Sequence, residues 1–225
     1  MDQRRDQYLE AMGITRWVPR RAAGESGAPI SNGEDAIPDL DWEALRHRVS
    51  ACRLCGLHEG RTQAVFGVGN PAADWMIIGE APGAEEDRVG EPFVGRAGQL
   101  LDAMLEGLGL SRQRVYIANV LKCRPPNNRD PSQKEASQCA PYLQRQITLV
   151  APSVILAVGR VAAQNLLGAE GPLGRMRGRI HHYGAQEIPL VVTYHPAYLL
   201  RRPAEKAKTW RDLLLAAQVV SGNST

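Results

Sequence analysis

Four short apolar runs alternate with helical patterns along residues 39–220, and this alternation determines the predicted fold. Each run is nearly continuous in apolar residues, which is typical of a strand buried on both faces of a parallel sheet. Strands that alternate with helices predict such a sheet with helices packed on both sides. We therefore expect an α/β fold with three α/β/α layers and a central, four-stranded, mainly parallel sheet. The predicted strands are 75–79, 115–121, 154–159 and 189–194.

The helices are predicted from apolar spacing and from capping residues. Asp39 or Asp41 is a suitable N-cap for the first helix of the folded domain. Ser132 and Glu135 have the spacing of a capping box, and we expect Pro141 to interrupt or restart the helix that they begin. Further helices are predicted over about 100–108, 160–168 and 204–219.

The N-terminal residues differ in composition from the rest of the chain. Residues 4–21 mix charges with large apolar side chains, and residues 22–38 are rich in Ala, Gly, Ser and Pro, as linkers are. A short apolar segment on a linker is typical of a docking peptide, although it can equally fold back onto its own domain. We expect a flexible arm over 1–38, a folded domain over 39–220 and a tail over 221–225.

Composition and charge exclude several classes of protein. The chain has 225 residues and a formal charge of +3, so any binding of nucleic acid must come from local clusters of charge. No apolar run approaches the roughly 18 residues of a membrane span, and the N-terminus has no secretory signal. We expect a cytoplasmic monomer with no membrane segment. In that compartment the four cysteines are candidates for metal binding or catalysis rather than for disulfides.

The cysteine spacing favours a metal site. Cys52 and Cys55 form a tight pair, whereas Cys123 and Cys139 are separated by fifteen residues, so the fold itself must bring the two pairs together. Four thiolates suit zinc or an iron–sulfur cluster equally well on spacing alone. Ordinary buried cysteines are the alternative.

Three polar residues follow the predicted strands at their carboxyl ends. Glu80 comes directly after the first strand, Asn119 lies near the end of the second, and His195 follows the fourth. Ligands of parallel sheets bind at this edge. A connection of about eighteen residues, rich in glycine, proline and charge, follows the first strand and is long for a simple turn. We expect the functional site here.

Four motifs occur in unbroken order within the region from Cys52 to Leu200. They are GEAPG at 79–83, PFVG at 92–95, NVLKCRPP at 119–126 and TYHPAYLL at 193–200. Together with the four cysteines, this set closely resembles the family 4 uracil-DNA glycosylases, which are iron–sulfur members of the uracil-DNA glycosylase superfamily. The resemblance implies a 4Fe-4S cluster of structural role on Cys52, Cys55, Cys123 and Cys139.

The implied activity is monofunctional hydrolysis of the N-glycosidic bond of deoxyuridine in single- or double-stranded DNA, leaving an abasic site for base excision repair. The base must leave the duplex to be reached. Phe93 would stack on it, and the Asn119 amide would read its O4 and N3–H. His195 would donate to O2 and stabilise the negative charge that develops on the base. Backbone groups from Gly79 to Ala81 would close the pocket.

Two carboxylates are further candidates for a role in the reaction. Glu80 is a candidate to orient the attacking water and to stabilise the cationic sugar, with structural placement of its loop as the alternative. Family 1 enzymes of the superfamily carry an aspartate in the corresponding motif and this chain does not, which leaves the identity of a general base open. Glu86 is a candidate for excluding the methyl group of thymine.

Charge is locally positive in the C-terminal third. The segment from Arg160 to Arg211 contains nine Lys or Arg residues and only three Glu. Such an excess fits DNA phosphates, and an apolar segment beside His195 would fill the gap left by a flipped base. The predicted DNA contacts are Arg124, Arg129, Tyr198, Leu199, Arg201 and Arg202.

The arm over 4–21 is similar to the N-terminal peptide of the psi subunit of the bacterial clamp loader, which docks on the chi subunit. This similarity implies tethering to chi. It also defines the alternative function, a non-catalytic replisome or DNA adaptor on the same fold. The combination of Glu80, Phe93, Asn119 and His195 favours the enzyme, because an adaptor needs no uracil pocket.

Overall fold

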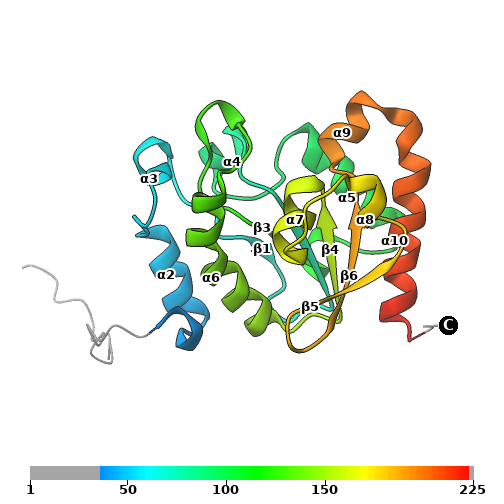
Figure 1. Cartoon of the computed structure of the whole chain (residues 1–225), viewed down its shortest axis with the longest axis horizontal. Coiled ribbons are helices and arrows are strands. Elements are labelled where there is room, and N and C mark those ends of the chain that lie inside the picture. The colour runs from blue at the N-terminus through cyan, green and yellow to red at the C-terminus, as the bar shows by residue number, and fades with distance from the viewer. Residues whose placement is uncertain (1–35, 223–225) are drawn as a thin grey trace, which may run out of the picture. The chain divides into compact units, whose positions relative to one another are not determined.

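A six-stranded sheet runs through the computed structural model, which describes residues 36–222 (Figure 1). The strand order is β1-β3-β2-β4-β6-β5, and the four central strands are parallel. The predicted α/β fold with a mainly parallel sheet is therefore confirmed. The strands are β1 (Val68–Gly69), β2 (Trp75–Gly79), β3 (Tyr116–Asn119), β4 (Val154–Val158), β5 (Ile180–Tyr183) and β6 (Ile188–Thr193).

The prediction of four strands was incomplete, because β1 and β5 add an antiparallel strand at each edge. Both edge strands lack the apolar pattern that identified the others. β1 has only two residues, and the side chains of β5 alternate between exposed and half-buried. Edge strands need no apolar run, since one side of each faces solvent rather than another strand.

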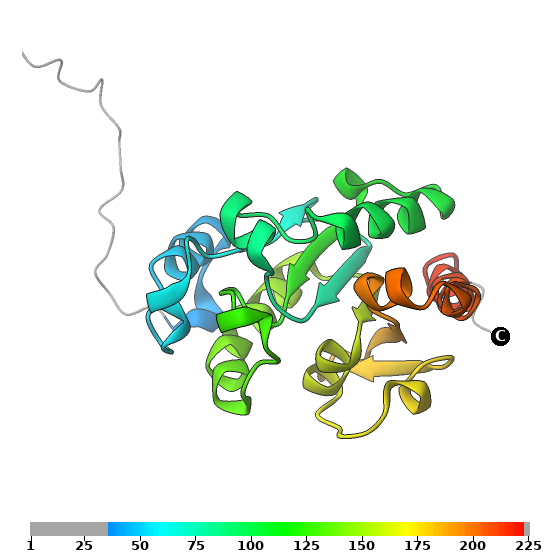
Figure 2. The same ribbon diagram turned by 90° about the horizontal axis from the view of Figure 1, so that it is seen from above.

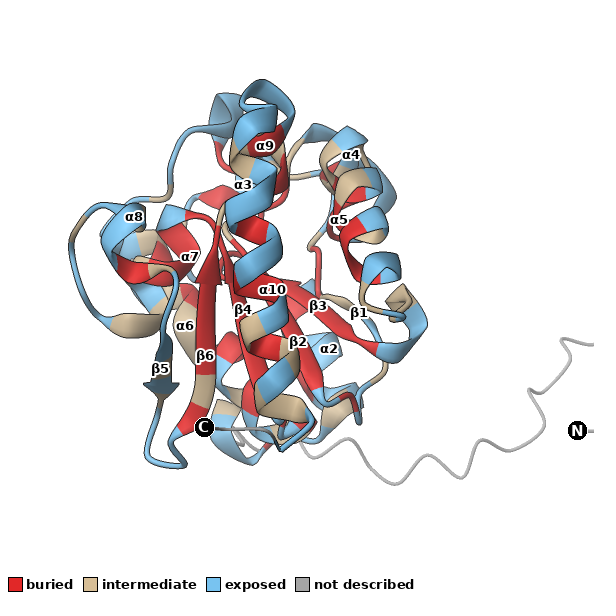
Figure 3. Ribbon diagram, turned by 90° about the vertical axis from the view of Figure 1, so that its right-hand side faces the viewer, coloured by how far each residue is buried: buried red, intermediate tan, exposed pale blue. Residues whose placement is uncertain are grey.

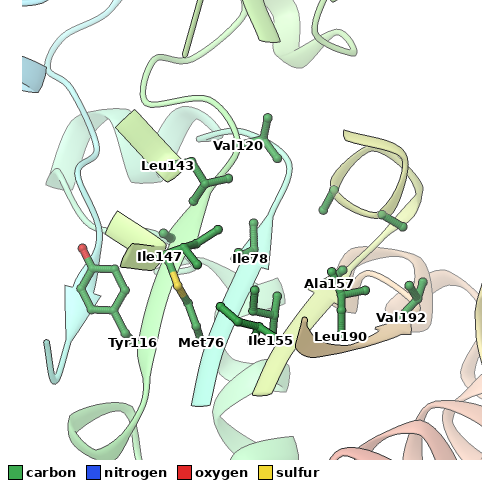
Figure 4. Close-up of a cluster of buried hydrophobic side chains, with 14 of the residues drawn as sticks. Met76, Ile78, Tyr116, Val120, Leu143, Ile147, Ile155, Ala157, Leu190 and Val192 are labelled. Atoms are coloured by element: carbon green, nitrogen blue, oxygen red, sulfur yellow. The ribbon is translucent and has the colours of Figure 1, made fainter. Parts of the chain in front are cut away.

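The central strands bury both of their faces, as their continuous apolar sequences require. Met76 and Ile78 of β2 point to one side, where Figure 4 shows them with Ile147. Ile77 points to the other side and packs in a second cluster with Leu105. All five side chains are almost completely buried, and each contributes about 1.5–3 kcal/mol to the free energy of unfolding.

Helices cover the two faces in separate layers (Figure 2). One layer consists of α6, α7 and α8, and the other of α5, α9 and α10. Figure 3 shows that α10 buries one side and exposes the other to solvent. The bounds are α5 (Arg96–Gly107), α6 (Gln133–Val150), α7 (Arg160–Leu167), α8 (Leu173–Met176), α9 (Pro196–Arg201) and α10 (Lys206–Val220), with 3-10 turns η2 (Arg112–Arg114), η3 (Pro126–Asn128) and η4 (Pro203–Glu205).

The capping residues behave largely as predicted. Asp41 accepts a hydrogen bond from the Ala44 main-chain N–H, and Ser132 and Glu135 form a reciprocal capping box. The expected interruption at Pro141 was wrong, because α6 continues through it. A proline inside a helix costs about 3 kcal/mol, and burial of the flanking α6 side chains in the core offsets this cost.

A third cluster of buried residues lies beyond α6, where the first helices of the described chain pack. It contains the side chains of all four cysteines, two of them partly buried. The helices are η1 (Ile37–Asp39), α2 (Trp42–Ser50) and α3 (Leu57–Gly60), and α4 (Ala84–Val89) lies in the connection that follows β2. The predicted docking peptide at 4–21 lies outside the described residues. Within them, no helix has the length and apolarity needed to span a membrane.

Candidate active site

A cavity of about 500 Å³ lies at the carboxyl ends of β2, β3 and β6. Five of the six residues predicted to bind uracil line it, and they come from three separate strand ends and the loop after α4. The structure therefore brings these predicted residues together at one sheet edge. The five are Glu80, Ala81, Phe93, Asn119 and His195.

The sixth predicted residue, Gly79, lies directly behind the cavity wall. It ends β2 and pairs with Asn119 at the end of β3, which places the Asn119 amide beside it. A Cβ atom on Gly79 would lie 2.4 Å from Asn119 Oδ1 and 2.7 Å from Phe93 Cζ. Only a residue without a side chain leaves room for the amide and the ring together. Asn119 is itself buried, with 3% of its surface exposed.

Phe93 is held in a strained conformation by the loop around it. Its φ angle is 55°, in the left-handed region that costs a bulky residue about 1–3 kcal/mol. Arg112 donates to the main-chain oxygens of Pro92 and Phe93 and pairs with Asp102 at 3.0 Å. Gly98 permits the approach, because a Cβ there would lie 1.7 Å from the Phe93 carbonyl oxygen. These contacts fix the ring over the cavity.

Glu86 organises the same loop from the other side. One carboxylate oxygen accepts from the Gly83 main-chain N–H and the other from the Val94 main-chain N–H, each at 3.1 Å. The carboxylate thus ties the start of α4 to the segment that carries Phe93. Both oxygens are already engaged by the backbone, so an influence of Glu86 on the bound base would act through the position of the loop.

His195 is oriented by its own helix. It is the N-cap of α9, and the Ala197 main-chain N–H donates to its Nδ1 at 3.1 Å. This bond places the ring hydrogen on Nε2. Burial lowers the pKa of His195 to about 4, with Glu86 opposing the change and Arg201 adding to it, so the imidazole is neutral near pH 7. The ring stacks on Phe93 with a centroid distance of 5.4 Å.

Glu80 has a perturbed ionisation. Burial and the nearby charge of Asp130 raise the pKa of its carboxyl to about 7, and Arg160 opposes the change. Asp130 lines the same cavity and is bound by Arg160 at 2.5 Å. Both forms of Glu80 are therefore accessible near neutral pH. Such a shift in a cleft is common at functional carboxylates.

The four cysteines line one small cavity of about 10 Å³ between α2, α6 and the segment after β3. None forms a disulfide. Arg61 donates to Cys123 Sγ at 2.8 Å, and the Lys122 main-chain N–H donates to Cys139 Sγ at 3.3 Å. Such N–H donors to sulfur are usual around iron–sulfur clusters.

No group of three or more Cys, His, Asp or Glu residues within 36–222 is arranged around a single metal ion. In a cuboidal cluster each thiolate binds a different iron, so its four sulfur atoms do not converge on one point. The donor set and the common location of the four cysteines therefore fit such a cluster.

Comparisons with known proteins identify the family. The model of the uracil DNA glycosylase superfamily matches residues 66–214. A type-4 uracil-DNA glycosylase of Archaeoglobus fulgidus is 47% identical over 161 residues, which are 69% of this chain and 81% of that protein. A type-4 enzyme of Pyrobaculum aerophilum is 42% identical over 182 residues, covering 78% and 93% of the two chains. One of Thermotoga maritima is 42% identical over 168 residues, covering 74% and 86%.

The chain belongs to the type-4 uracil-DNA glycosylases. The match runs from just before β1 into α10 and so includes the whole cavity of this glycosylase. The resemblance predicted from the four sequence motifs is therefore confirmed.

The predicted DNA contacts of the glycosylase fall into two groups. Arg124 and Arg129 lie in the segment between Cys123 and Cys139. Arg124 donates to Asn128, and Arg129 pairs with Glu135 at 2.6 Å. Because its guanidinium already binds a carboxylate, Arg129 offers less charge to a phosphate than its sequence indicated.

The second group surrounds α9. Leu199 is 1% exposed and packs in the core, so its prediction as a DNA contact was wrong. Leu200, the next residue, is 38% exposed. Arg201 and Arg202 are exposed, and Tyr198 lines the cavity. An exposed apolar side chain followed by two arginines therefore lies beside the site.

A stack of side chains supports Tyr198. The centres of the Tyr198 and Tyr194 rings lie 5.0 Å apart. The Arg177 guanidinium lies over the Tyr194 ring, 5.0 Å from its centre. Arg177 is held by a buried ion pair with Asp212 at 2.7 Å, and Asp212 also accepts from Thr193. The strand that delivers His195 is thereby joined to α10.

Sequence reasoning missed several residues of the site. Asn128, the last residue of η3, and Asp130, in the loop after it, line the cavity, and Arg112 holds the Phe93 loop. None of them lies at a strand end or in a recognised spacing. Only the packing of the loops brings them to the cavity. The charge of Asp130 beside Glu80 could not be found from the chain alone.

Proposed function

We propose that this chain is a monofunctional uracil-DNA glycosylase that hydrolyses the N-glycosidic bond of deoxyuridine in DNA and leaves an abasic site. The observation that carries the proposal is the convergence of Glu80, Phe93, Asn119 and His195 on one cavity in a member of the type-4 family. Among residues 36–222 no lysine lines this cavity, which supports hydrolysis without a covalent Schiff-base intermediate.

The uracil ring lies against Phe93, and its polar edge faces Asn119. The asparagine NH₂ donates to O4 and its carbonyl accepts from N3–H. Cytosine reverses donor and acceptor at these two positions, so it leaves buried polar groups unpaired and is rejected. Backbone groups of Gly79, Glu80 and Ala81 complete the pocket. A base reaches this position only after leaving the helical stack, or from single-stranded DNA.

His195 stabilises the leaving group. Cleavage of the N1–C1′ bond leaves negative charge on the uracil ring, part of it on O2. The neutral imidazole donates its Nε2–H toward that oxygen, because Nδ1 is occupied by the Ala197 N–H. The proton stays on Nε2, and the base departs as an anion.

Glu80 acts on the other product of the cleavage, the cationic sugar. Its carboxylate stabilises positive charge at C1′ and orients the water that attacks there. This role needs the ionised form, which a pKa of about 7 makes available at neutral and higher pH. Asp130 adds negative charge to the same cavity.

Cys52, Cys55, Cys123 and Cys139 would hold a 4Fe-4S cluster. The cluster would supply structural cross-linking, since it would join α2, α6 and the segment that follows Asn119. The loop between the last two cysteines carries Asn128 and Asp130 to the cavity. Fixing this loop supports the site without a redox step in the reaction.

DNA is held beside the cavity by the exposed arginines of α9. Arg201, Arg202 and Arg124 bind phosphates, whose contacts position the strand without reading its sequence. Leu200 and Tyr198 fill the space left by the extruded nucleotide, as apolar wedges do in other proteins that deform DNA. Leu200 takes the place first predicted for Leu199.

A single copy of the chain supplies every residue that lines the cavity, which supports action as a monomer. The compartment that we propose is the cytoplasm. Residues 4–21 tether the enzyme to the clamp-loader chi subunit. The support for this tether is the sequence similarity alone, since these residues lie outside the described part of the chain. Calorimetric titration of a peptide spanning residues 1–25 into chi tests it, and no heat of binding would refute it.

The activity is tested with an end-labelled oligonucleotide that contains one uracil. Anaerobically purified, iron-loaded protein should produce strand breaks at the uracil only after alkali treatment, and none with thymine in its place. Breaks without alkali would contradict a monofunctional enzyme. No breaks from iron-loaded protein would contradict the enzyme altogether and favour the adaptor.

A further inference from the structure

Lys122 is a charged residue that the proposed reaction leaves without a role. It is almost completely buried, with 2% of its surface exposed, between the cysteines and the cavity. Its Nζ donates to the main-chain oxygen of Asn119 at 2.8 Å and to Gln146 Oε1 at 2.5 Å. Its main-chain N–H donates to Cys139 Sγ. One residue thus contacts the base-reading strand end through its ammonium group and the cysteine segment through its main chain.

The hydrogen-bond partners of the ammonium group are neutral. A buried charge is costly unless an opposite charge balances it. Within residues 36–222, no carboxylate forms an ion pair with Lys122, and this residue lines the small cavity that the four cysteines share. A thiol is neutral, whereas a metal-bound cysteine is a thiolate. A cluster on these cysteines would therefore supply the missing counter-charge.

The Asn119 carbonyl needs a partner from outside the sheet. The neighbouring edge strand β1 pairs only with Tyr116 and Ile117 and ends before it reaches Asn119. An unpaired buried carbonyl costs free energy and leaves the chain free to move. The Lys122 ammonium supplies this hydrogen bond and fixes the backbone from which the Asn119 amide projects.

We propose that Lys122 is a positioning residue that couples the cysteine site to the base-reading amide of Asn119. Its charge is balanced by the cluster-bound thiolates, and its ammonium holds the Asn119 main chain in place. The inference rests on the proposed cluster and on the proposed role of Asn119. It predicts that loss of this one side chain weakens cluster retention and slows base release together.

The alternative is that Lys122 only stabilises a buried polar network. Gln146 belongs to the same network, since its Nε2 donates to the Phe66 carbonyl and to the Tyr116 hydroxyl. It is also fully buried, but its hydrogen bonds reach neither Asn119 nor a cysteine. Gln146→Met is therefore the matched control for Lys122→Met, because each replaces one member of the network by a similar apolar chain.

The two iron-loaded variants and the wild type are compared in three measurements: kcat and KM on the uracil oligonucleotide, the rate of iron transfer to a chelator, and the melting temperature. A displacement of about 1 Å in a catalytic group costs about 100-fold in rate. Lys122→Met should therefore lose roughly 10- to 100-fold in kcat with little change in KM, and should release iron several-fold faster. Gln146→Met should melt lower yet keep both rates.

Equal kcat and iron release in Lys122→Met and the wild type would overturn the proposal. So would losses in both variants that simply follow their melting temperatures. If Lys122→Met does not accumulate, Lys122→Gln replaces it. This variant keeps an N–H donor but no charge, so it should lose iron faster than the wild type, and wild-type iron retention would overturn the proposal. A wild-type protein without iron or without uracil release would instead contradict the proposed function itself.

Discussion

Replacement of Gly79 by alanine tests whether the cavity is as closely fitted as the structure indicates. Gly79 ends β2 and is not among the glycines with a positive φ, so alanine suits its backbone. The added methyl group would lie 2.4 Å from Asn119 Oδ1 and 2.7 Å from Phe93 Cζ. The substitution therefore acts through contact with two residues of the site and not through backbone strain.

The magnitude follows from these two distances. Ordinary contacts of a Cβ atom begin near 3.4 Å, so the amide oxygen and the ring lie about 1.0 Å and 0.7 Å too close. Asn119 and Phe93 are both buried, so each can move away from the methyl group only into the cavity that they line. A displacement of this size costs about 100-fold in kcat/KM, equivalent to about 2.7 kcal/mol of transition-state stabilisation.

The assay is excision of uracil from a single-uracil oligonucleotide, measured well below the melting temperature of each variant. Gly95→Ala is the matched control, since Gly95 belongs to a neighbouring motif, has a φ of −83° and has open space around its Cβ position. It should stay within roughly threefold of the wild type, as substitutions without new contacts usually do. A Gly79→Ala variant as active as this control would refute the reasoning.

Further predictions concern the roles of three individual side chains. Because the pKa of Glu80 is raised to about 7 and the ionised form is the active one, wild-type excision should fall as the pH drops below about 7. Glu80→Gln should be slow at every pH and should lack this dependence. The same pH profile in the variant and the wild type would exclude the proposed role of Glu80. His195→Ala should lower kcat by about 10²–10³-fold, as loss of an oxyanion donor does, and a smaller loss would contradict its proposed role. Because burial lowers the pKa of His195 to about 4, the pH–rate curve of Glu80→Gln, which lacks the titration of Glu80, should show no step near pH 6.5, and a step there would contradict a neutral His195. Cys123→Ala should lose bound iron and melt at a lower temperature, and full iron content by metal analysis would contradict the ligand assignment.

The sequence predicted the centre of the fold because the central strands are buried on both faces. In a chain that alternates strands with helices, a continuous apolar run such as 154–158 is best explained as a buried parallel strand. The edge strands carry no such pattern, and β5 was missed for that reason. Pro141 was misjudged because tertiary packing, which local propensity does not include, holds α6 together.

The site residues that could be predicted are the polar residues that stand at the ends of parallel strands. Glu80, Asn119 and His195 stand at strand ends, and parallel strands end at one edge, so their convergence on a cavity follows from the fold. Arg112 and Asp130 come from loops whose course depends on packing. Which of the adjacent Leu199 and Leu200 is buried depends on how the short helix α9 is turned about its axis. The sequence does not distinguish the two leucines.

The central claim is that the cavity reads uracil through Asn119. It is tested most directly by the single-turnover rate of uracil release by iron-loaded Asn119→Ala protein, beside the wild type. Asn128→Ala is the control, because Asn128 lines the same cavity but is bound by Arg124. The account predicts a loss of about 100-fold or more for Asn119→Ala, with iron content and melting unchanged, and a loss of no more than a few-fold for Asn128→Ala. Uracil release by Asn119→Ala at the wild-type rate would contradict it.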